Sequence, residues 1–130
     1  MIGVFHGCGL ESITIPLTVK EIGEDAFRGC TDLVSVQLHE GVQKIDAGAF
    51  RGCELEYITT PSTVKEIRED TFKGCTDMAS VQLHEGLQKI DAGAFRGCGL
   101  QYITITLTVH EIGEDAFFYC TDLALPSTIS

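Results

Sequence analysis

The sequence predicts a repeat solenoid, in which short, similar turns stack along one axis and their strands pair in a parallel β-sheet. Two observations lead to this fold class. The six cysteines recur at spacings that alternate between 22 and 23 residues, and they are Cys8, Cys30, Cys53, Cys75, Cys98 and Cys120. When the turns are aligned on these cysteines, apolar residues fall in the same columns along the chain. A unit this short cannot bury its own apolar residues, so neighbouring turns must cover one another.

We expect a single domain over residues 1–130. Its five full turns are predicted at about 9–30, 31–53, 54–75, 76–98 and 99–120, with truncated turns at 1–8 and 121–130. The spacing alternates because the link after the cysteine has one residue in Cys53-Glu54-Leu55 and two in Cys30-Thr31-Asp32-Leu33. The true repeating unit is therefore a pair of turns, 45 residues long.

Each turn contains three segments, which the first full turn illustrates. Ile13-Thr14-Ile15 alternates in side-chain direction and is followed by Pro16, as is typical of a short strand. Val19-Lys20-Glu21-Ile22 has apolar residues three apart, so we expect a second extended or turn segment. Residues 24–30 start with acids, carry a late base and have a glycine near the end, which predicts one helical turn. Strands of successive turns would pair about 4.8 Å apart.

Two columns bear on packing and register. The aromatic column closes each full turn and consists of Phe27, Phe50, Phe72, Phe95 and Phe117. A second column alternates in charge and consists of Glu21, Lys44, Glu66, Lys89 and Glu111. Opposite charges on adjacent strands attract weakly, and a slip by one turn would place like charges opposite each other. We therefore interpret the charged column as a device that fixes the register.

The repeat pattern L-x-x-I-x-[IL]-P-x-x-V-x-x-I-G-x-x-A-F-x-G-C, complete in residues 10–30, closely resembles the BspA-like or treponemal-type leucine-rich repeat. The resemblance implies a right-handed solenoid with its parallel sheet on the concave side. It also implies a surface or interaction protein, often adhesive, with no enzymatic role. The chain departs from the pattern at several positions, among them Thr60 in an aliphatic column, Arg68 and Thr71 in turn three, and Tyr119 in place of glycine.

The composition excludes some classes of function. With 9 Lys and Arg against 19 Asp and Glu, the formal net charge is -10, so the chain would repel nucleic acid. No apolar run approaches the roughly 18 residues of a membrane span, and residues 1–6 do not resemble a signal peptide. The sequence leaves localisation undetermined. A column of free cysteines would suit a reducing compartment, whereas the family resemblance allows the cell surface.

The residues that often carry chemistry predict no catalytic, cofactor-binding or metal site. Cysteines in one column point the same way, so they favour buried thiols over disulfides and offer no four converging zinc ligands. The four histidines are His6, His39, His84 and His110. His39 and His84 occupy equivalent positions two turns apart, so they would lie about 10 Å apart, too far to share a metal. The acidic stripe is interpreted as a solvated face rather than a cation site, and it comprises Glu24, Asp25, Asp46, Glu69, Asp70, Asp91, Glu114 and Asp115.

The outward strand positions are the candidate partner-binding site. They are uncharged and rich in hydroxyl groups, and they comprise Ser12, Thr14, Ser35, Gln37, Tyr57, Thr59, Ser80, Gln82, Tyr102 and Thr104. Tyrosine is favoured at interfaces, although tyrosine and threonine also simply suit exposed strands. The predicted function is a non-enzymatic module that binds a protein partner through this concave face. The alternative is a structural array, a spacer or adhesive fragment, that associates through uncapped ends, for instance as an end-to-end dimer.

Overall fold

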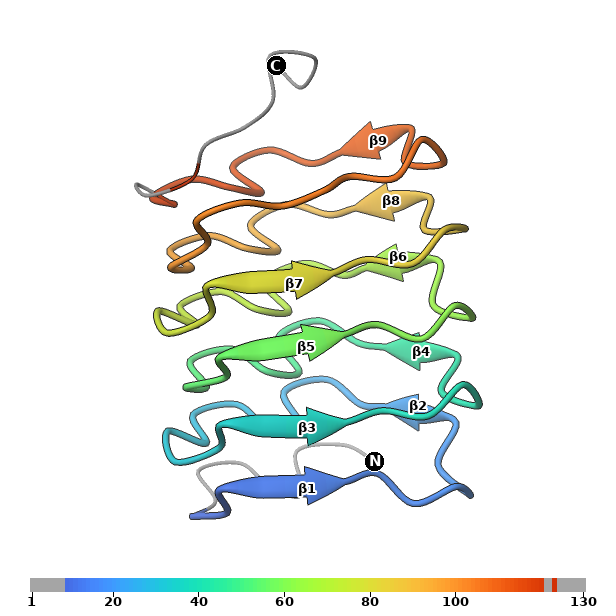
Figure 1. Ribbon diagram of the computed structural model, residues 1–130, viewed down its shortest axis with the longest axis vertical. Helices are drawn as coiled ribbons and strands as arrows, with labels where there is room; N and C mark the ends of the chain where they lie inside the picture. Colours follow the sequence, from blue (N-terminus) through green and yellow to red (C-terminus); the bar gives the residue numbers. More distant parts are fainter. Residues whose placement is uncertain (1–8, 121–122, 124–130) are drawn as a thin grey trace.

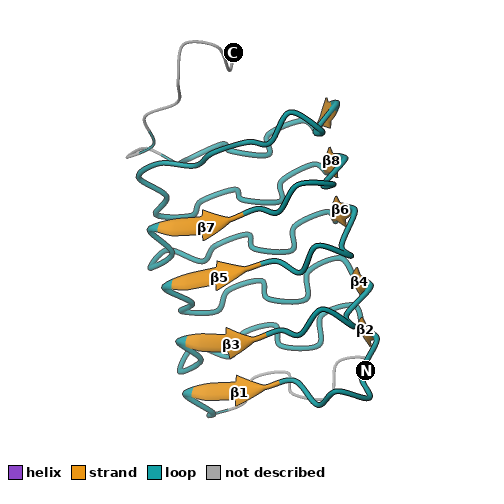
Figure 2. Cartoon of the chain, turned by 45° about the vertical axis from the view of Figure 1, so that its right-hand side comes forward, coloured by secondary structure: helices purple, strands orange, loops and turns teal. Residues whose placement is uncertain are grey.

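The computed structural model describes residues 9–120 and residue 123, which form a coil of stacked turns (Figure 1). One side of the coil carries three-residue strands, which are β1 (Ser12–Thr14), β3 (Ser35–Gln37), β5 (Tyr57–Thr59) and β7 (Ser80–Gln82). Another side carries two-residue strands, which are β2 (Glu21–Ile22), β4 (Lys44–Ile45), β6 (Glu66–Ile67), β8 (Lys89–Ile90) and β9 (Glu111–Ile112). Figure 2 shows the two sets on separate sides. All pairing is parallel, so the predicted solenoid is confirmed.

The register of the strands follows the sequence columns. Ser12 of β1 lies opposite Ser35 of β3, and Tyr57 of β5 lies opposite Ser80 of β7. In the charged column, Lys89 of β8 lies between its neighbours on β6 and β9. The alignment on cysteines therefore places the correct residues side by side.

The ladder of longer strands is interrupted, which the sequence analysis did not anticipate. It consists of two separate pairs, β1 with β3 and β5 with β7, so it repeats with the 45-residue unit. Residues 102–104, where a strand was expected, form none. Just before them, the Gln101 N–H donates to the Ala79 carbonyl oxygen at 3.0 Å. Both interruptions follow one-residue links, Cys53-Glu54-Leu55 and Cys98-Gly99-Leu100.

The expected helical turn at residues 24–30 is instead a series of tight turns. The N–H groups of Ala26, Arg28 and Cys30 bond to carbonyls three residues earlier in the same turn. The N–H groups between them, on Asp25 and Phe27 for example, bond to the next turn. Asp25 has a φ of 57°, a left-handed conformation that a right-handed helix does not accept. The order of charges is the one expected in a helix, but every second N–H group bonds to a carbonyl oxygen of the next turn.

The aromatic column forms the centre of the core. Phe27, Phe50, Phe72 and Phe95 are fully buried, and each ring stacks on the next with centroids 5.3 to 5.7 Å apart. Phe117 continues the stack at 5.5 Å. Since each ring covers its neighbour, the apolar surface of one turn is buried by the next.

The two polar residues in core columns are buried and hydrogen-bonded. Thr71 donates to the Arg68 carbonyl oxygen at 2.9 Å, and Thr60 has a long contact of 3.4 Å with the Gln82 carbonyl oxygen. These bonds offset the cost of burying a hydroxyl group. The sequence departures at these positions are therefore accommodated within the fold.

The truncated ends fall largely outside the described residues. This applies to the apolar side chains expected to be exposed there, namely Ile2, Val4, Phe5, Leu125 and Ile129. Leu123 is described, and it is half-buried against the core.

Candidate binding face

The strand face, meaning the ten outward residues predicted above as the partner-binding site, is open to solvent along the coil. Thr59 and Ser80 are half-buried and the other eight are exposed, including Ser12, Thr14, Ser35 and Gln37 at the N-terminal end. The exposure follows from strand geometry, because alternate side chains point to opposite faces and Val36 and Ile58 take the inward positions. All ten residues lack charge, in contrast to the other columns on the surface.

A hydrogen-bonded chain orders the middle of the strand face. The Thr59 hydroxyl donates to the Tyr57 hydroxyl at 2.5 Å, and the Tyr57 hydroxyl donates to Gln82 Oε1 at 3.0 Å. The second bond spans two adjacent turns. Tyr57 remains 48% exposed, so its ring is held in place and still accessible. The sequence columns show that Tyr57 and Gln82 are near neighbours but give no sign of this bond.

A hollow of about 460 Å³ lies on the strand face over β7. Tyr57 and Tyr102 border it from the turns on either side of β7, and Tyr102 is 64% exposed. Ser80, Gln82 and Thr104 also line it. The structure thus gathers five of the predicted site residues around one hollow. The serines and threonines of the first two turns lie outside it.

The cysteine column is buried and serves packing. Cys75 Sγ donates to the Phe50 carbonyl oxygen at 3.2 Å, and Cys98 Sγ donates to that of Phe72 at 2.9 Å, one turn earlier in each case. The hydrogen bond with Cys98, followed by burial, holds the pKa of the Cys75 thiol well above its usual value. Burial raises the pKa of the Cys120 thiol to about 11. These thiols are therefore protonated and unreactive at neutral pH.

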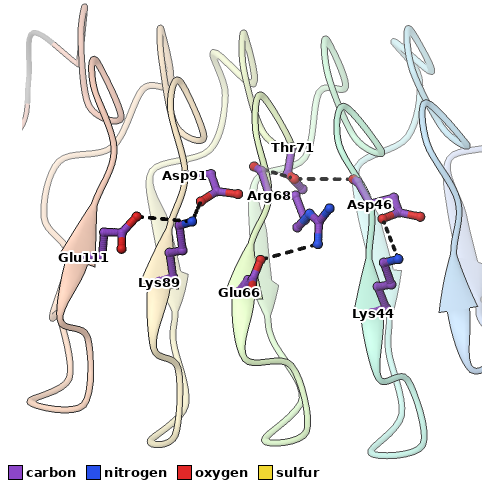
Figure 3. A network of polar contacts seen from close by, with 8 residues as sticks. All are labelled: Lys44, Asp46, Glu66, Arg68, Thr71, Lys89, Asp91 and Glu111. Carbon is purple, nitrogen blue, oxygen red and sulfur yellow. Dashed lines mark hydrogen bonds and ion pairs between the residues drawn. The ribbon is translucent and has the colours of Figure 1, made fainter.

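The charged columns pair with one another across the surface (Figure 3). Lys89 Nζ lies 3.2 Å from Glu111 Oε2 and 3.4 Å from Asp91 Oδ1, and the hydrogen bond with Glu111 contributes most to raising the pKa of Lys89. In the turn before, Arg68 contacts Glu66 within its own turn at 3.4 Å. Among the described residues of this column, Lys89 makes a cross-turn ion pair, whereas Glu66 pairs with Arg68 and Lys44 pairs with Asp46 at 3.5 Å, each within its own turn. That the column fixes the register stays an interpretation.

Acids and histidines make local contacts. Arg28 pairs with Asp25 at 3.6 Å. His39 Nε2 lies 2.9 Å from the Pro16 carbonyl oxygen, and its Nδ1 accepts from the Gly41 N–H, so it ties one corner to the turn before. Within residues 9–120 and residue 123, no three His, Cys, Asp or Glu side chains converge to hold a metal ion.

The repeat columns, the stacked phenylalanines and the parallel ladders together define the family. The model of the BspA type leucine rich repeat region matches residues 2–124 in six copies. This chain belongs to that family. BspA-type proteins are commonly surface interaction proteins, and leucine-rich repeat proteins are typically non-enzymatic. The part of this BspA-type chain that the structure describes has no helix able to cross a membrane.

Solved structures of similar proteins share the solenoid. A leucine-rich cell surface protein from Faecalibacterium prausnitzii matches with a TM-score of 0.86 and 33% identity, over 93% of this chain and 34% of that one. A leucine-rich repeat protein from Bacteroides ovatus matches with a TM-score of 0.83 and 35% identity, over 88% of this chain and 32% of that one. The pneumococcal vaccine antigen PcpA matches with a TM-score of 0.80 and 26% identity, over 90% of this chain and 31% of that one. The chain spans about a third of the length of each. No curated protein gives a match.

Proposed function

We propose that this chain is a non-enzymatic protein-binding module that holds its partner on the strand face. The observation that carries the proposal is the hollow between Tyr57 and Tyr102. Exposed tyrosines contribute much contact area and lose little conformational freedom on binding. The bond from Tyr57 to Gln82 fixes one ring before a partner arrives, which lowers the entropy cost of binding.

A cell-surface, adhesive setting fits the proposal. The relative from Faecalibacterium prausnitzii is described as a cell surface protein. The cysteine column does not oppose this setting, because buried thiols such as Cys75 resist oxidation through their raised pKa. A reducing compartment would suit the same thiols equally well, so the support comes from the relative.

Selection from a random peptide-display library tests the proposal. The wild-type chain should enrich clones that bind it, and the double variant Tyr57→Ala/Tyr102→Ala should bind the same clones at least about tenfold more weakly. Leu107→Ser is the matched control, because Leu107 is a fully exposed side chain that does not line the hollow. Circular dichroism should show the same fold for every variant. Clones that bind the double variant as well as the wild type would overturn the proposal.

Self-association through the ends is a second candidate role. One observation favours it: Ile112, the apolar residue of β9, is 43% exposed, whereas its counterparts Ile22, Ile45, Ile67 and Ile90 are buried. Exposed apolar surface at the edge of a sheet is a site of association. An end-to-end dimer is the simplest closed product of such contact.

A further inference from the structure

We propose that turn five, residues 99–120, carries a second binding site, which holds neutral sugar units of a glycan chain. The site consists of an exposed aromatic pair, Phe118 and Tyr119, and a charged hollow beside it that shares no residue with the hollow over β7. Three features carry the proposal: a strained, exposed tyrosine, an arginine held against both rings, and a mixture of acids and bases that suits hydroxyl groups.

The aromatic pair breaks the repeat at two adjacent positions. The four preceding turns have a base and a glycine there, namely Arg28-Gly29, Arg51-Gly52, Lys73-Gly74 and Arg96-Gly97. Those glycines have φ values of 73–78°, and Tyr119 adopts the same left-handed conformation with a φ of 64°. A bulky residue is strained in this conformation, and Tyr119 is 63% exposed, so little burial offsets the strain. Strain at an exposed side chain points to a function for that side chain.

Arg96 connects the aromatic pair to the hollow, which it also lines. Its guanidinium carbon lies 5.3 Å from the centroid of the Phe118 ring and 5.7 Å from that of Tyr119. Arg51, its counterpart one 45-residue unit earlier, instead lies 4.0 Å from Asp70 Oδ2. Among the described residues, Arg96 makes no ion pair with a carboxylate. Its guanidinium therefore steadies the two rings and keeps N–H donors for a ligand.

The charged hollow has a volume of about 310 Å³ and lies over a corner of turn four. Turn four has the small pair Ala92-Gly93 where turns three and five have acids, and a Cβ at Gly93 would collide with Asp70 Oδ1. The small corner thus leaves room between two acidic corners. The charged residues of the lining are Glu69, Asp70, Lys73, Arg96, Glu114 and Asp115.

This mixture of charges suits a neutral ligand that is rich in hydroxyl groups. A cation would meet Lys73 and Arg96, and an anion would meet four carboxylates, so a ligand of either charge encounters like charge. Carboxylates only accept hydrogen bonds and lysine and arginine only donate them, whereas a hydroxyl does both. Neighbouring hydroxyls of one sugar can therefore bond to an acid and to a base together.

The rings and the length of the hollow favour a sugar chain. The C–H groups on one face of a sugar ring can pack on the negative face of an aromatic ring such as Tyr119. The hollow reaches from turn three to turn five, which is about 10 Å at the spacing of neighbouring strands. That distance exceeds one sugar ring, so linked sugars fill the hollow better than a free one.

Affinity electrophoresis of the intact chain tests the proposal. Native gels would contain a soluble β-glucan, glycogen or a mannan, and we expect at least one of these neutral polysaccharides to retard the wild-type chain. Tyr119→Gly should weaken this binding at least about tenfold. Glycine is the repeat residue at this position, so the variant should melt at or above the wild-type temperature, which separates loss of binding from loss of fold. Free glucose or mannose should compete only at much higher concentration.

Two equivalent aspartates give a matched pair of variants. Asp115→Asn removes a carboxylate that lines the hollow and should weaken binding about fivefold. Asp25→Asn is the control, because Asp25 occupies the same column outside the hollow and has a φ of 57°, against 59° for Asp115. Asparagine tolerates this conformation, so both variants should fold, and Asp25→Asn should leave binding unchanged.

Several results would overturn the inference. They are the absence of retardation in all three gels, equal retardation of the wild type and Tyr119→Gly, and equal losses in the two aspartate variants. Heparin and chitosan test the argument from charge: Tyr119-dependent binding to either of these charged polysaccharides alone would contradict a neutral ligand. If display-selected peptides bind in a Tyr119-dependent way and no polysaccharide does, the aromatic pair is a protein contact and the inference is wrong.

Discussion

Replacing Phe72 by alanine should be among the most damaging single changes in the described core. The ring is fully buried and stacks on both sides, 5.7 Å from Phe50 and 5.4 Å from Phe95. Removal of a buried phenylalanine side chain costs about 3–5 kcal/mol, and two lost ring contacts place this position toward the upper part of that range. For a chain of this size, about 1 kcal/mol lowers the melting temperature by about 4 °C, so we expect a fall of about 12–20 °C.

Thermal melting followed by far-ultraviolet circular dichroism measures the effect, and hydrogen exchange locates it. Because each turn is stabilised mainly by its neighbours, exchange should quicken first in 54–75 and then in the turns beside it. Phe118→Ala is the control, since Phe118 is 45% exposed and lies outside the stack, and it should lower the melting temperature far less. A Phe72→Ala variant that melts within about 2 °C of the wild type would refute the buried stack.

Four further experiments test other parts of the structure. Thiol labelling should be slow for Cys75 and Cys98 until the chain unfolds; fast labelling of the native protein would contradict their burial. The folded-state pKa of Cys120 is raised to about 11, so its stabilising contribution is complete below the usual value of 9.0 and is lost as pH rises through 11. The urea midpoint should therefore fall over that window, and less so in Cys120→Ala. Gly52→Ala should lower the free energy of unfolding by about 1 kcal/mol, because Gly52 has a φ of 75°; an unchanged urea midpoint would count against that conformation. Sedimentation over a wide concentration range should reveal a dimer that Ile112→Ser weakens, and a wild-type chain that stays monomeric throughout would rule out association through the ends.

The periodic features of the fold are predictable from the sequence because every turn repeats the same physical problem. A column such as Glu66, Lys89 and Glu111 fixes which residues are neighbours. The register, the buried phenylalanines and the cysteine column all follow from that rule. The row of outward residues is predictable in the same way, since alternation on a strand requires only a correct phase.

The features that the sequence did not reveal depend on small differences between turns. The prediction of a helical turn at residues 24–30 was wrong because Asp25 adopts a left-handed backbone conformation, which its charge does not indicate. Residues 102–104 do not pair with β7, whereas a repeat pattern predicts pairing at every turn. The Tyr57–Gln82 bond depends on side-chain rotamers, which column alignment does not specify.

The open ladders also give the coil a weakest point under tension. Between Cys53 and Glu54 neither ladder is paired, since β3 is separate from β5 and β4 is separate from β6. Across this junction the turns remain tied beside the longer strands, where the Glu56 N–H donates to the Val34 carbonyl oxygen at 3.2 Å. They are also tied at one corner, where the Ser62 hydroxyl donates to Glu40, and along the aromatic side, where the Phe50 N–H donates to the Thr71 carbonyl oxygen. A load applied along the axis would therefore concentrate here, and the two 45-residue units would part as intact blocks before either unravels.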